Sequence, residues 1–308
     1  MFGSFMRGMT VTAAHSTRAP RRCCVLTLRP TAAFYNATMC GRYALHTHPE
    51  VIALQLGVQG GAGIDARSTL APERLAGWKP RWNIAPTATV PVVIARSDTA
   101  PQLHWLRWGL IPSWANDVSI GAKLNNARAE SVTEKPAFRQ AFSKPASRRG
   151  RCLIPADGYF EWQEAPAGVR GARKQPYYLQ QANGKLLAMA GIWDSWQSAQ
   201  GELFESFAVL TIAPNKEAAL IHERMPVLIA DEDRQRWLLG NPTEALALLR
   251  TAPDDTLRTH AVDRRMSSAR IDDAQCIAAV KLNEPDEESP ETKAASSDSH
   301  QDRQGRLL

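Results

Sequence analysis

The sequence predicts an α+β protein whose sheet is largely antiparallel and closes into a barrel, with helices at its periphery. Short runs that are apolar or alternate between apolar and polar residues, mostly bounded by Pro and Gly, indicate several strands. Helical patterns are few and short, and no internal repeat occurs. This mixture of short strands and separate helices is typical of an α+β domain built around one sheet system.

The expected strands follow one another from the first third of the chain onward. We expect a tight hairpin turn at Asn183-Gly184, since Asn-Gly favours the backbone angles of two-residue turns. The predicted strands are Thr89–Arg96, Gln102–Leu110, Arg148–Ala156, Gln175–Gln181, Leu186–Trp193 and Ser206–Ala213.

Helices are expected over His48–Leu56, Ala127–Phe142 and Asp231–Leu239. Gly240-Asn241-Pro242 ends the third of these helices. Asn241 is also a good N-cap, and Pro242 suits the first turn, so another helix is expected to begin there.

Two tails flank the expected domain, which spans residues 39–282. With 308 residues, of which 44% are hydrophobic, the chain is long enough for a sizeable core. Residues 1–38 contain five arginines and no acidic residue, and they show no periodicity. They are expected to be a disordered leader or upstream sequence, with an organelle-targeting presequence as the alternative. Residues 283–308 are polar and charged, which predicts a disordered tail.

Composition excludes several classes of protein. No run approaches the roughly 18 apolar residues of a membrane helix, so no membrane association is expected. The five cysteines form no C-x-x-C pair, which argues against a disulfide framework or zinc ribbon and favours the cytoplasm. Cys40, His46 and His48 match no metal-site spacing, and no cofactor is expected. The net charge of +6 and the basic cluster from Lys123 to Arg151 are weak signs of a polyanionic partner.

Cys40, in the stretch "TMCGRYAL", is the first candidate for chemistry. A cysteine with a free α-amine is a 1,2-aminothiol. Its amine, with a pKa of roughly 8, condenses with an aldehyde to an imine, and its thiol then closes a thiazolidine ring. The alternative is a buried structural cysteine, and this holds if the preceding residues stay attached.

Two further segments carry polar candidates. Asn126 and Arg128 in "NNARAES" are two residues apart, so on a strand they share one face, where an amide and a guanidinium can hold a nucleophile and a phosphate. The alternative for Asn126 is a helix N-cap. Glu161 in "DGYFEW" lies among aromatic residues, and desolvation there would raise its pKa toward a value useful in acid–base catalysis. The sequence taken alone favours an exposed glutamate at a strand end.

A lone histidine and two tryptophan-rich segments complete the candidates. His222 in "LIHERMP" stands between apolar runs, where a histidine is more often structural than catalytic. The segments Trp108–Trp114 and Pro80–Pro86 combine aromatic residues with prolines. Aromatic side chains near a basic cluster can stack on unpaired bases, but they can equally belong to the core.

In their order along the chain, the motifs "MCGRYAL", "RWNIAPT", "WGLIPSWA", "NARAES", "CLIPADGYFEW" and "IHERMP" resemble the SRAP family of SOS-response-associated peptidases, or abasic-site processing proteins. The resemblance spans Met39 to about Pro226. It implies a single α+β domain around a twisted, barrel-like, mainly antiparallel sheet. It also implies a monomer that crosslinks its exposed N-terminal cysteine to ring-opened abasic sites in single-stranded DNA, bound at the nucleoid when at lesions.

The resemblance assigns roles residue by residue. Cys40 would supply both the amine and the sulfur, and Asn126 would position this terminus. Glu161 would move protons during ring opening and imine formation, and His222 would be a second acid–base group. The residues expected to contact DNA or orient the site are Arg42, Trp114, Arg128, Trp162 and Arg224. The sequence departs from the family pattern in one respect, because Cys40 is not the second residue. The active form is therefore expected to begin at Cys40, through an internal start at Met39 or cleavage after it.

Two rival functions remain open. An N-terminal-nucleophile amidohydrolase also exposes a cysteine, but it leaves the basic cluster and the Trp-Pro segments unexplained. A single-strand-binding module without chemistry would predict that Cys40 is dispensable.

Overall fold

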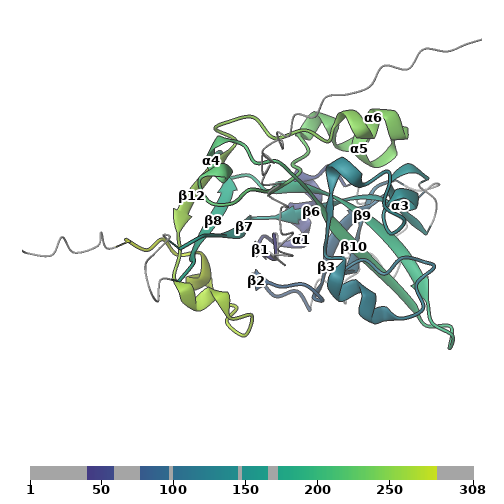
Figure 1. Ribbon diagram of the computed structural model, residues 1–308, viewed down its shortest axis with the longest axis horizontal. Helices are drawn as coiled ribbons and strands as arrows, with labels where there is room; N and C mark the ends of the chain where they lie inside the picture. Colours follow the sequence, from purple (N-terminus) through teal and green to yellow (C-terminus); the bar gives the residue numbers. More distant parts are fainter. Residues whose placement is uncertain (1–39, 59–76, 97–99, 145–147, 166–172, 283–308) are drawn as a thin grey trace, which may run out of the picture. The chain divides into compact units, whose positions relative to one another are not determined.

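The computed structural model describes residues 40–58, 77–96, 100–144, 148–165 and 173–282. Both predicted tails lie outside this part of the chain. One of the two sheets is five-stranded and antiparallel at every described pairing. Its strands, in spatial order, are β12 (Leu257–Ala261), β8 (Gln175–Gln181), β7 (Gly158–Gln163), β1 (Arg42–Leu45) and β2 (Arg81–Ile84). In Figure 1 they lie on the left and toward the centre.

The second sheet closes into a barrel, because β9 pairs with both β6 and β10. The barrel strands, in spatial order, are β10 (Leu203–Ile212), β4 (Gln102–Trp108), β3 (Thr89–Ile94), β6 (Arg149–Ala156) and β9 (Leu187–Gln197). Two short strands, β5 (Asn126–Arg128) and β11 (Met225–Pro226), also pair with β10. The pairings of β10 with β4 and β5 are parallel, and the other described pairings are antiparallel. The predicted fold class, with its barrel-like and mainly antiparallel sheet, is therefore confirmed.

The helices are short. The α-helices are α1 (Pro49–Gln55), α3 (Arg139–Ser143), α4 (Lys216–Ala219), α5 (Arg234–Leu239) and α6 (Pro242–Ala247). In Figure 1, α5 and α6 lie at the top of the view, α3 at the right and α4 at the upper left. The 3-10 helices are η1 (Val118–Lys123), η2 (Ala129–Ser131), η3 (Asp231–Asp233), η4 (Arg264–Ser267) and η5 (Ala274–Ile277). Asn241 caps α6 as predicted, with the reciprocal bond from Glu244 that completes a capping box.

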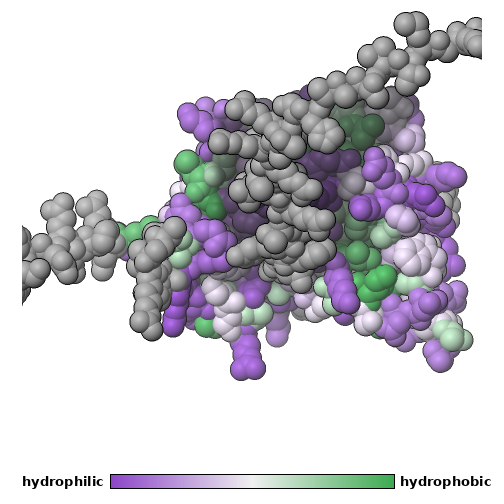
Figure 2. Space-filling model, in the orientation of Figure 1, coloured by the Kyte–Doolittle hydropathy of each residue, from purple (hydrophilic) through white to green (hydrophobic). Residues whose placement is uncertain are grey.

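The five-stranded sheet carries apolar side chains on both faces. One face joins the main core, which contains Tyr43 and Tyr159 together with the barrel residues Trp108 and Trp193. The other face packs against the segment that holds η4 and η5, in a smaller cluster of Ala44, Phe160, Tyr178, Val262, Met266 and Cys276. Because neighbouring residues of β1 and β7 fall into different clusters, each strand alternates between two buried environments. Figure 2 shows hydrophilic side chains over much of the described surface on one face of the molecule.

Two expectations for local structure were wrong. No continuous helix forms over Ala127–Phe142, because Asn126–Arg128 pairs with β10 as a strand and only Arg139–Ser143 is α-helical. The turn at Asn183-Gly184 forms, with Gly184 at a φ of 76°. It does not make a hairpin, since β8 and β9 belong to different sheets. Among the described helices, none has the length and apolar character required to span a bilayer.

Candidate active site

Cys40 and Glu161 meet at the beginning of β1. The antiparallel register of β1 and β7 pairs Arg42 with Phe160, which brings the residues just before β1 alongside the end of β7. The backbone N–H of Cys40 donates a hydrogen bond of 3.0 Å to Oε1 of Glu161. Only 4% of Cys40 and 2% of Glu161 is exposed. Glu161 is therefore not the exposed residue that the sequence taken alone favours. Its buried carboxyl group contacts the nitrogen of the candidate nucleophile.

Burial dominates the electrostatics of this pair. Desolvation raises the pKa of Glu161 to about 8, although hydrogen bonds from Cys40 act in the opposite direction. Desolvation also raises the pKa of the Cys40 thiol well above its usual value, and the charge of Glu161 raises it further. The positive charge of Arg224 acts against this rise. Near neutral pH the site therefore holds a protonated thiol beside a carboxyl group that can both take up and release a proton.

Cys40 also has an unusual backbone conformation. Its φ of 39° lies in the left-handed region, which residues other than glycine seldom adopt. Such a conformation costs on the order of 1–3 kcal/mol and tends to occur at functional sites. The surrounding contacts therefore hold Cys40 in a strained position.

Asn126 and Arg128 reach the site from β5. The alternation along this strand buries Ala127 and directs Asn126 and Arg128 to the opposite side, as predicted. Asn126 Nδ2 donates to the backbone oxygen of Cys40 over 3.4 Å. Asn126 lies within β5, so it is not a helix cap. Arg128 is exposed at the end of the strand. The parallel pairing with β10 fixes both positions.

His222 and Arg224 lie in the link between α4 and β11. His222 Nδ1 accepts a hydrogen bond of 3.1 Å from the backbone N–H of Arg224 and lies 3.3 Å from its backbone oxygen. The Arg224 guanidinium donates to both carboxylate oxygens of Glu130, over 2.7 and 2.8 Å, and to the backbone oxygen of Thr211 over 2.6 Å. Gln163 at the end of β7 donates to the oxygen of Leu220, which ties this link to the strand that carries Glu161.

Arg42 and Trp162 bind the segment that contains η4. The Arg42 guanidinium donates to Asn83 Oδ1 over 2.9 Å and to the backbone oxygens of Met266 and Ser267. The indole N–H of Trp162 donates to the hydroxyl of Ser267 over 3.1 Å. Both side chains thus anchor the segment that covers the outer face of β1 and β7.

Trp114 is 53% exposed on an anchored turn, where no described contact joins it to Cys40. The N–H of Ser113 donates to Asp194 Oδ2 over 2.9 Å, and the indole of Trp196 donates to the oxygen of Ala115 over 2.6 Å. The backbone of the turn is therefore held on both sides of Trp114, whose indole ring is exposed to solvent.

The basic cluster predicted from Lys123 to Arg151 is not one continuous surface. Arg151 is buried, with a guanidinium that donates to the backbone oxygens of Phe142, Trp237 and Gly240. This residue joins β6 to α3 and α5. The exposed bases of the cluster are Lys123, Arg128, Lys135, Arg139, Lys144 and Arg148.

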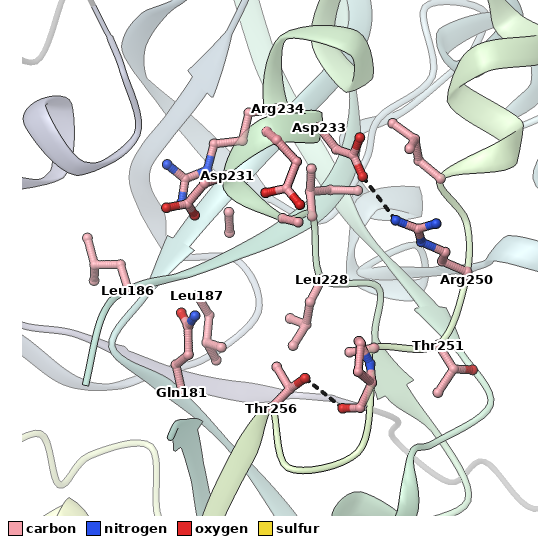
Figure 3. Close-up of a pocket in the computed structure, with 17 residues that line it drawn as sticks. Gln181, Leu186, Leu187, Leu228, Asp231, Asp233, Arg234, Arg250, Thr251 and Thr256 are labelled. Carbon is pink, nitrogen blue, oxygen red and sulfur yellow. Dashed lines mark hydrogen bonds and ion pairs between the residues drawn. The ribbon is translucent and has the colours of Figure 1, made fainter. Parts of the chain in front are cut away.

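A pocket of about 570 Å³ lies between η3, the segment that follows α6, and the ends of β8 and β9 (Figure 3). It shares no lining residue with the Cys40 site. Two of its carboxylates are already paired, Asp231 with Arg234 and Asp233 with Arg250. In the described part of the chain, no three His, Cys, Asp or Glu side chains gather closely enough to hold a metal ion.

Two residues of the site escaped the sequence reasoning. Glu130 was not among the candidate residues, yet its carboxylate pairs with the Arg224 guanidinium. Tyr159 was treated as part of an aromatic surround, but it shares a face of β7 with Glu161, whereas Phe160 and Trp162 face the other way. The two-residue period of a strand could have found Tyr159, had β7 been recognised.

Comparisons with known proteins show which family the chain belongs to. The family model for the SOS response associated peptidase (SRAP) matches residues 39–269. Abasic site processing protein YoqW of Bacillus subtilis (strain 168) is 31% identical over 242 residues, which cover 78% of this chain and 99% of YoqW. Abasic site processing protein HMCES of Gallus gallus is 29% identical over 243 residues, covering 68% of this chain and 69% of HMCES. A crystal structure from Bacteroides thetaiotaomicron has a TM-score of 0.65 at 25% identity, covering 79% of this chain and 100% of that one. The chain belongs to the SOS response associated peptidase family.

Proposed function

We propose that this protein processes abasic sites in single-stranded DNA by forming a covalent crosslink through Cys40 once the α-amine of this residue is exposed. Two relatives that align with this chain over most of their own length carry the name abasic site processing protein. The observation that carries the proposal is the 3.0 Å contact between the Cys40 nitrogen and Glu161. This contact places a carboxyl group that can exchange protons beside the nitrogen that has to attack the aldehyde.

The reaction would join two atoms of Cys40 to one carbon of the sugar. The neutral amine adds to the aldehyde of the ring-opened abasic site, and loss of water from this adduct gives an imine. Glu161 would protonate the departing hydroxyl and later regain a proton. The thiol then adds to the imine carbon, its proton passes to the nitrogen, and a thiazolidine ring closes. Because the C=N bond is removed, the adduct no longer promotes β-elimination, and strand cleavage remains at most a lyase side activity.

Exposure of the amine would come from an internal start at Met39 followed by methionine removal, or from autoproteolysis after Met39. The positive φ of Cys40 supports either route. The angle is defined by the peptide bond that precedes Cys40, so removal of residue 39 releases the strain at this position.

The other candidate residues would serve the same chemistry. Asn126 would hold the Cys40 carbonyl, and His222 would exchange protons near the sugar. Arg128 would bind phosphate, and Trp114 would stack on a base. In this structure the polar groups of Arg42, Trp162 and Arg224 are engaged with protein atoms, so we assign these three residues to shaping the site. The protein would act as a monomer in the cytoplasm.

Intact-mass measurement after incubation with a single-stranded oligonucleotide that carries one abasic site tests the proposal. We expect a chain that begins at Cys40, and a mass increase equal to the oligonucleotide minus one water. The undamaged oligonucleotide and the Cys40→Ala variant are the controls. A crosslinked chain that retains residues 1–39 would contradict the N-terminal mechanism, and no adduct from a chain that begins at Cys40 would contradict the function.

A further inference from the structure

Tyr159 places a buried hydroxyl group beside the reacting pair. Tyr159 and Glu161 lie two residues apart on β7, so their side chains share the face of this strand that looks into the main core. Phe160, between them, belongs to the smaller cluster on the opposite face. Glu161 is the residue that accepts the hydrogen bond from Cys40. The hydroxyl of Tyr159 therefore comes from the same strand face as the proposed proton carrier.

This hydroxyl has no hydrogen-bond partner among the described residues, although Tyr159 is only 1% exposed. Buried hydroxyl groups nearly always form hydrogen bonds, and one without a partner destabilises the fold. Such a group is explained when it forms its hydrogen bond in another state of the protein. Burial raises the pKa of Tyr159 well above its usual value, and the charges of Cys40 and Glu161 raise it further. The group thus stays protonated at neutral pH and lies within electrostatic range of both reacting residues.

We propose that Tyr159 is a positioning residue of this site, whose hydroxyl hydrogen-bonds the Glu161 carboxylate whenever that group has released its proton. The inference rests on the proposed function for its role in the reaction. In the dehydration step the proton passes from Glu161 to the departing hydroxyl, and a negative charge remains in a buried place. The Tyr159 O–H then donates to this charge without losing its own proton, so Glu161 is ready to be protonated again.

Apart from Cys40, which is itself a reactant, the described groups around Glu161 are engaged elsewhere. The Tyr177 hydroxyl, opposite Glu161 on β8, donates to Gln163 Oε1 over 3.3 Å. Arg224 is held by Glu130 and the backbone oxygen of Thr211. The Cys40 N–H already binds Oε1 of Glu161. The Cys40 thiol also hydrogen-bonds the Glu161 carboxyl group, but it is itself a reactant and has to leave this contact to add to the imine carbon. Half-buried His222 has its Nδ1 turned toward the backbone of Arg224.

The test is the pH dependence of crosslinking in the Tyr159→Phe variant, which keeps the ring and removes only the hydroxyl. In a plot of crosslinking rate against pH, the part of the wild-type curve that reports the titration of Glu161 is the part that Glu161→Gln lacks. A hydrogen bond to a charged group changes an equilibrium by roughly tenfold or more, so this part of the curve is expected to move up by about one pH unit in Tyr159→Phe.

Tyr43→Phe is the matched control. Its hydroxyl is also buried without a described partner, and Tyr43 pairs directly with Tyr159 across β1 and β7. The causes that raise its pKa are burial and Cys152, with neither Cys40 nor Glu161 among them. We therefore expect the Tyr43→Phe profile to match that of the wild type. Equal profiles in Tyr159→Phe and Tyr43→Phe would overturn the assignment.

A second measurement needs no DNA and separates the two proposals. The unfolding free energy of the wild type, Glu161→Gln, Tyr159→Phe and the double variant is measured from pH 5 to 10. Subtracting the unfolding free energy of Glu161→Gln from that of the wild type gives the pH dependence due to Glu161 when the Tyr159 hydroxyl is present. The same subtraction between the double variant and Tyr159→Phe gives it when the hydroxyl is absent. We expect the pKa of Glu161 obtained in this way to be about one unit higher without the hydroxyl. A shift without any crosslinking would overturn the proposed function but keep the hydrogen bond. Crosslinking without a shift would overturn the role of Tyr159 alone.

Discussion

At the scale of single residues, the proposed chemistry requires both a nitrogen and a sulfur on Cys40. Cys40→Ser keeps the amine but removes the sulfur, so the reaction should stop at the imine. We expect an adduct that survives only after borohydride reduction, or cleavage of the strand by β-elimination, and the same result for Cys40→Ala. Gel electrophoresis with and without the reductant makes the comparison. A stable unreduced adduct of Cys40→Ser would show that no thiazolidine is needed.

Glu161 should make stability depend on pH. Its pKa is about 8 in the folded chain, against an ordinary value of 4.5. A raised pKa means that the folded state binds this proton more tightly than the unfolded state does. The full contribution to stability is therefore present below pH 4.5 and is lost as pH rises through about 8. We expect Glu161→Gln to lack this decline, as measured by denaturant unfolding of the chain in which the Cys40 nitrogen is an amide. An identical slope in both proteins would contradict the buried, protonated carboxyl.

The same residue should limit the rate of crosslinking. General acid–base catalysis is typically worth about 10²–10⁴-fold, so Glu161→Gln is expected to slow adduct formation by that order while DNA affinity changes little. His222→Ala should have a smaller effect and should also slow reversal of the adduct, because reversal uses the same proton transfers. Time courses at saturating DNA measure both rates. Wild-type rates in both variants would assign these residues a structural role only.

At the scale of elements, β7 is the strand that positions the site, and Gly158 at its start leaves no room for a side chain. A Cβ there would lie 2.6 Å from the backbone oxygen of Leu179 and 2.4 Å from the Tyr178 ring. We expect Gly158→Ala to destabilise the fold by about 1–3 kcal/mol and to slow crosslinking, since β7 has to shift. Gly191→Ala, which meets Ile154, Cys152 and the oxygen of Ala208 on the barrel side, is the control. It should lose stability without slowing the reaction, as read by unfolding and crosslinking at a temperature where both variants are folded.

The elements also show what the sequence could predict. The barrel strands were found because they are long and apolar, and β8 was found with its exact bounds. The strands β1 and β7 were not predicted, although they carry the site. Each is short and buried on both faces, so it shows no polar alternation that would reveal a strand. Local propensity also mistook Ala127 and its neighbours for a helix, because the pairing with β10 that fixes them is a long-range contact.

The candidate site was more predictable than the strands that hold it. Cys40, Asn126 and Glu161 follow from motif and chemistry, and the structure brings the three together, while their roles stay predictions. The engagement of Arg224 by Glu130 could not be predicted, since these residues are 94 positions apart in the sequence. The burial of Arg151 likewise depends on backbone oxygens from α3 and α5.

At the scale of the whole molecule, we expect the exposed basic residues to determine how DNA is held. Arg128 stands exposed at the end of β5, on the side of the strand that faces the Cys40 site through Asn126. Binding of an undamaged single strand should weaken as salt rises, with a slope of roughly −0.7 per neutralised phosphate in a double-logarithmic plot. Because one arginine neutralises at most one phosphate, Arg128→Ala should reduce this slope by less than one unit.

Crosslinking by Arg128→Ala should be slower at low DNA concentration and should recover at saturation, since only binding is impaired. Arg258→Ala serves as the control, because Arg258 is also exposed but lies on β12, an edge strand of the five-stranded sheet. Its slope should equal that of the wild type. Fluorescence anisotropy between 50 and 300 mM salt measures all three proteins. If the affinity is independent of salt, or if both variants lower the slope equally, the phosphate contacts are not located at β5. The DNA strand would then have to be held by stacking on exposed aromatic residues such as Trp114.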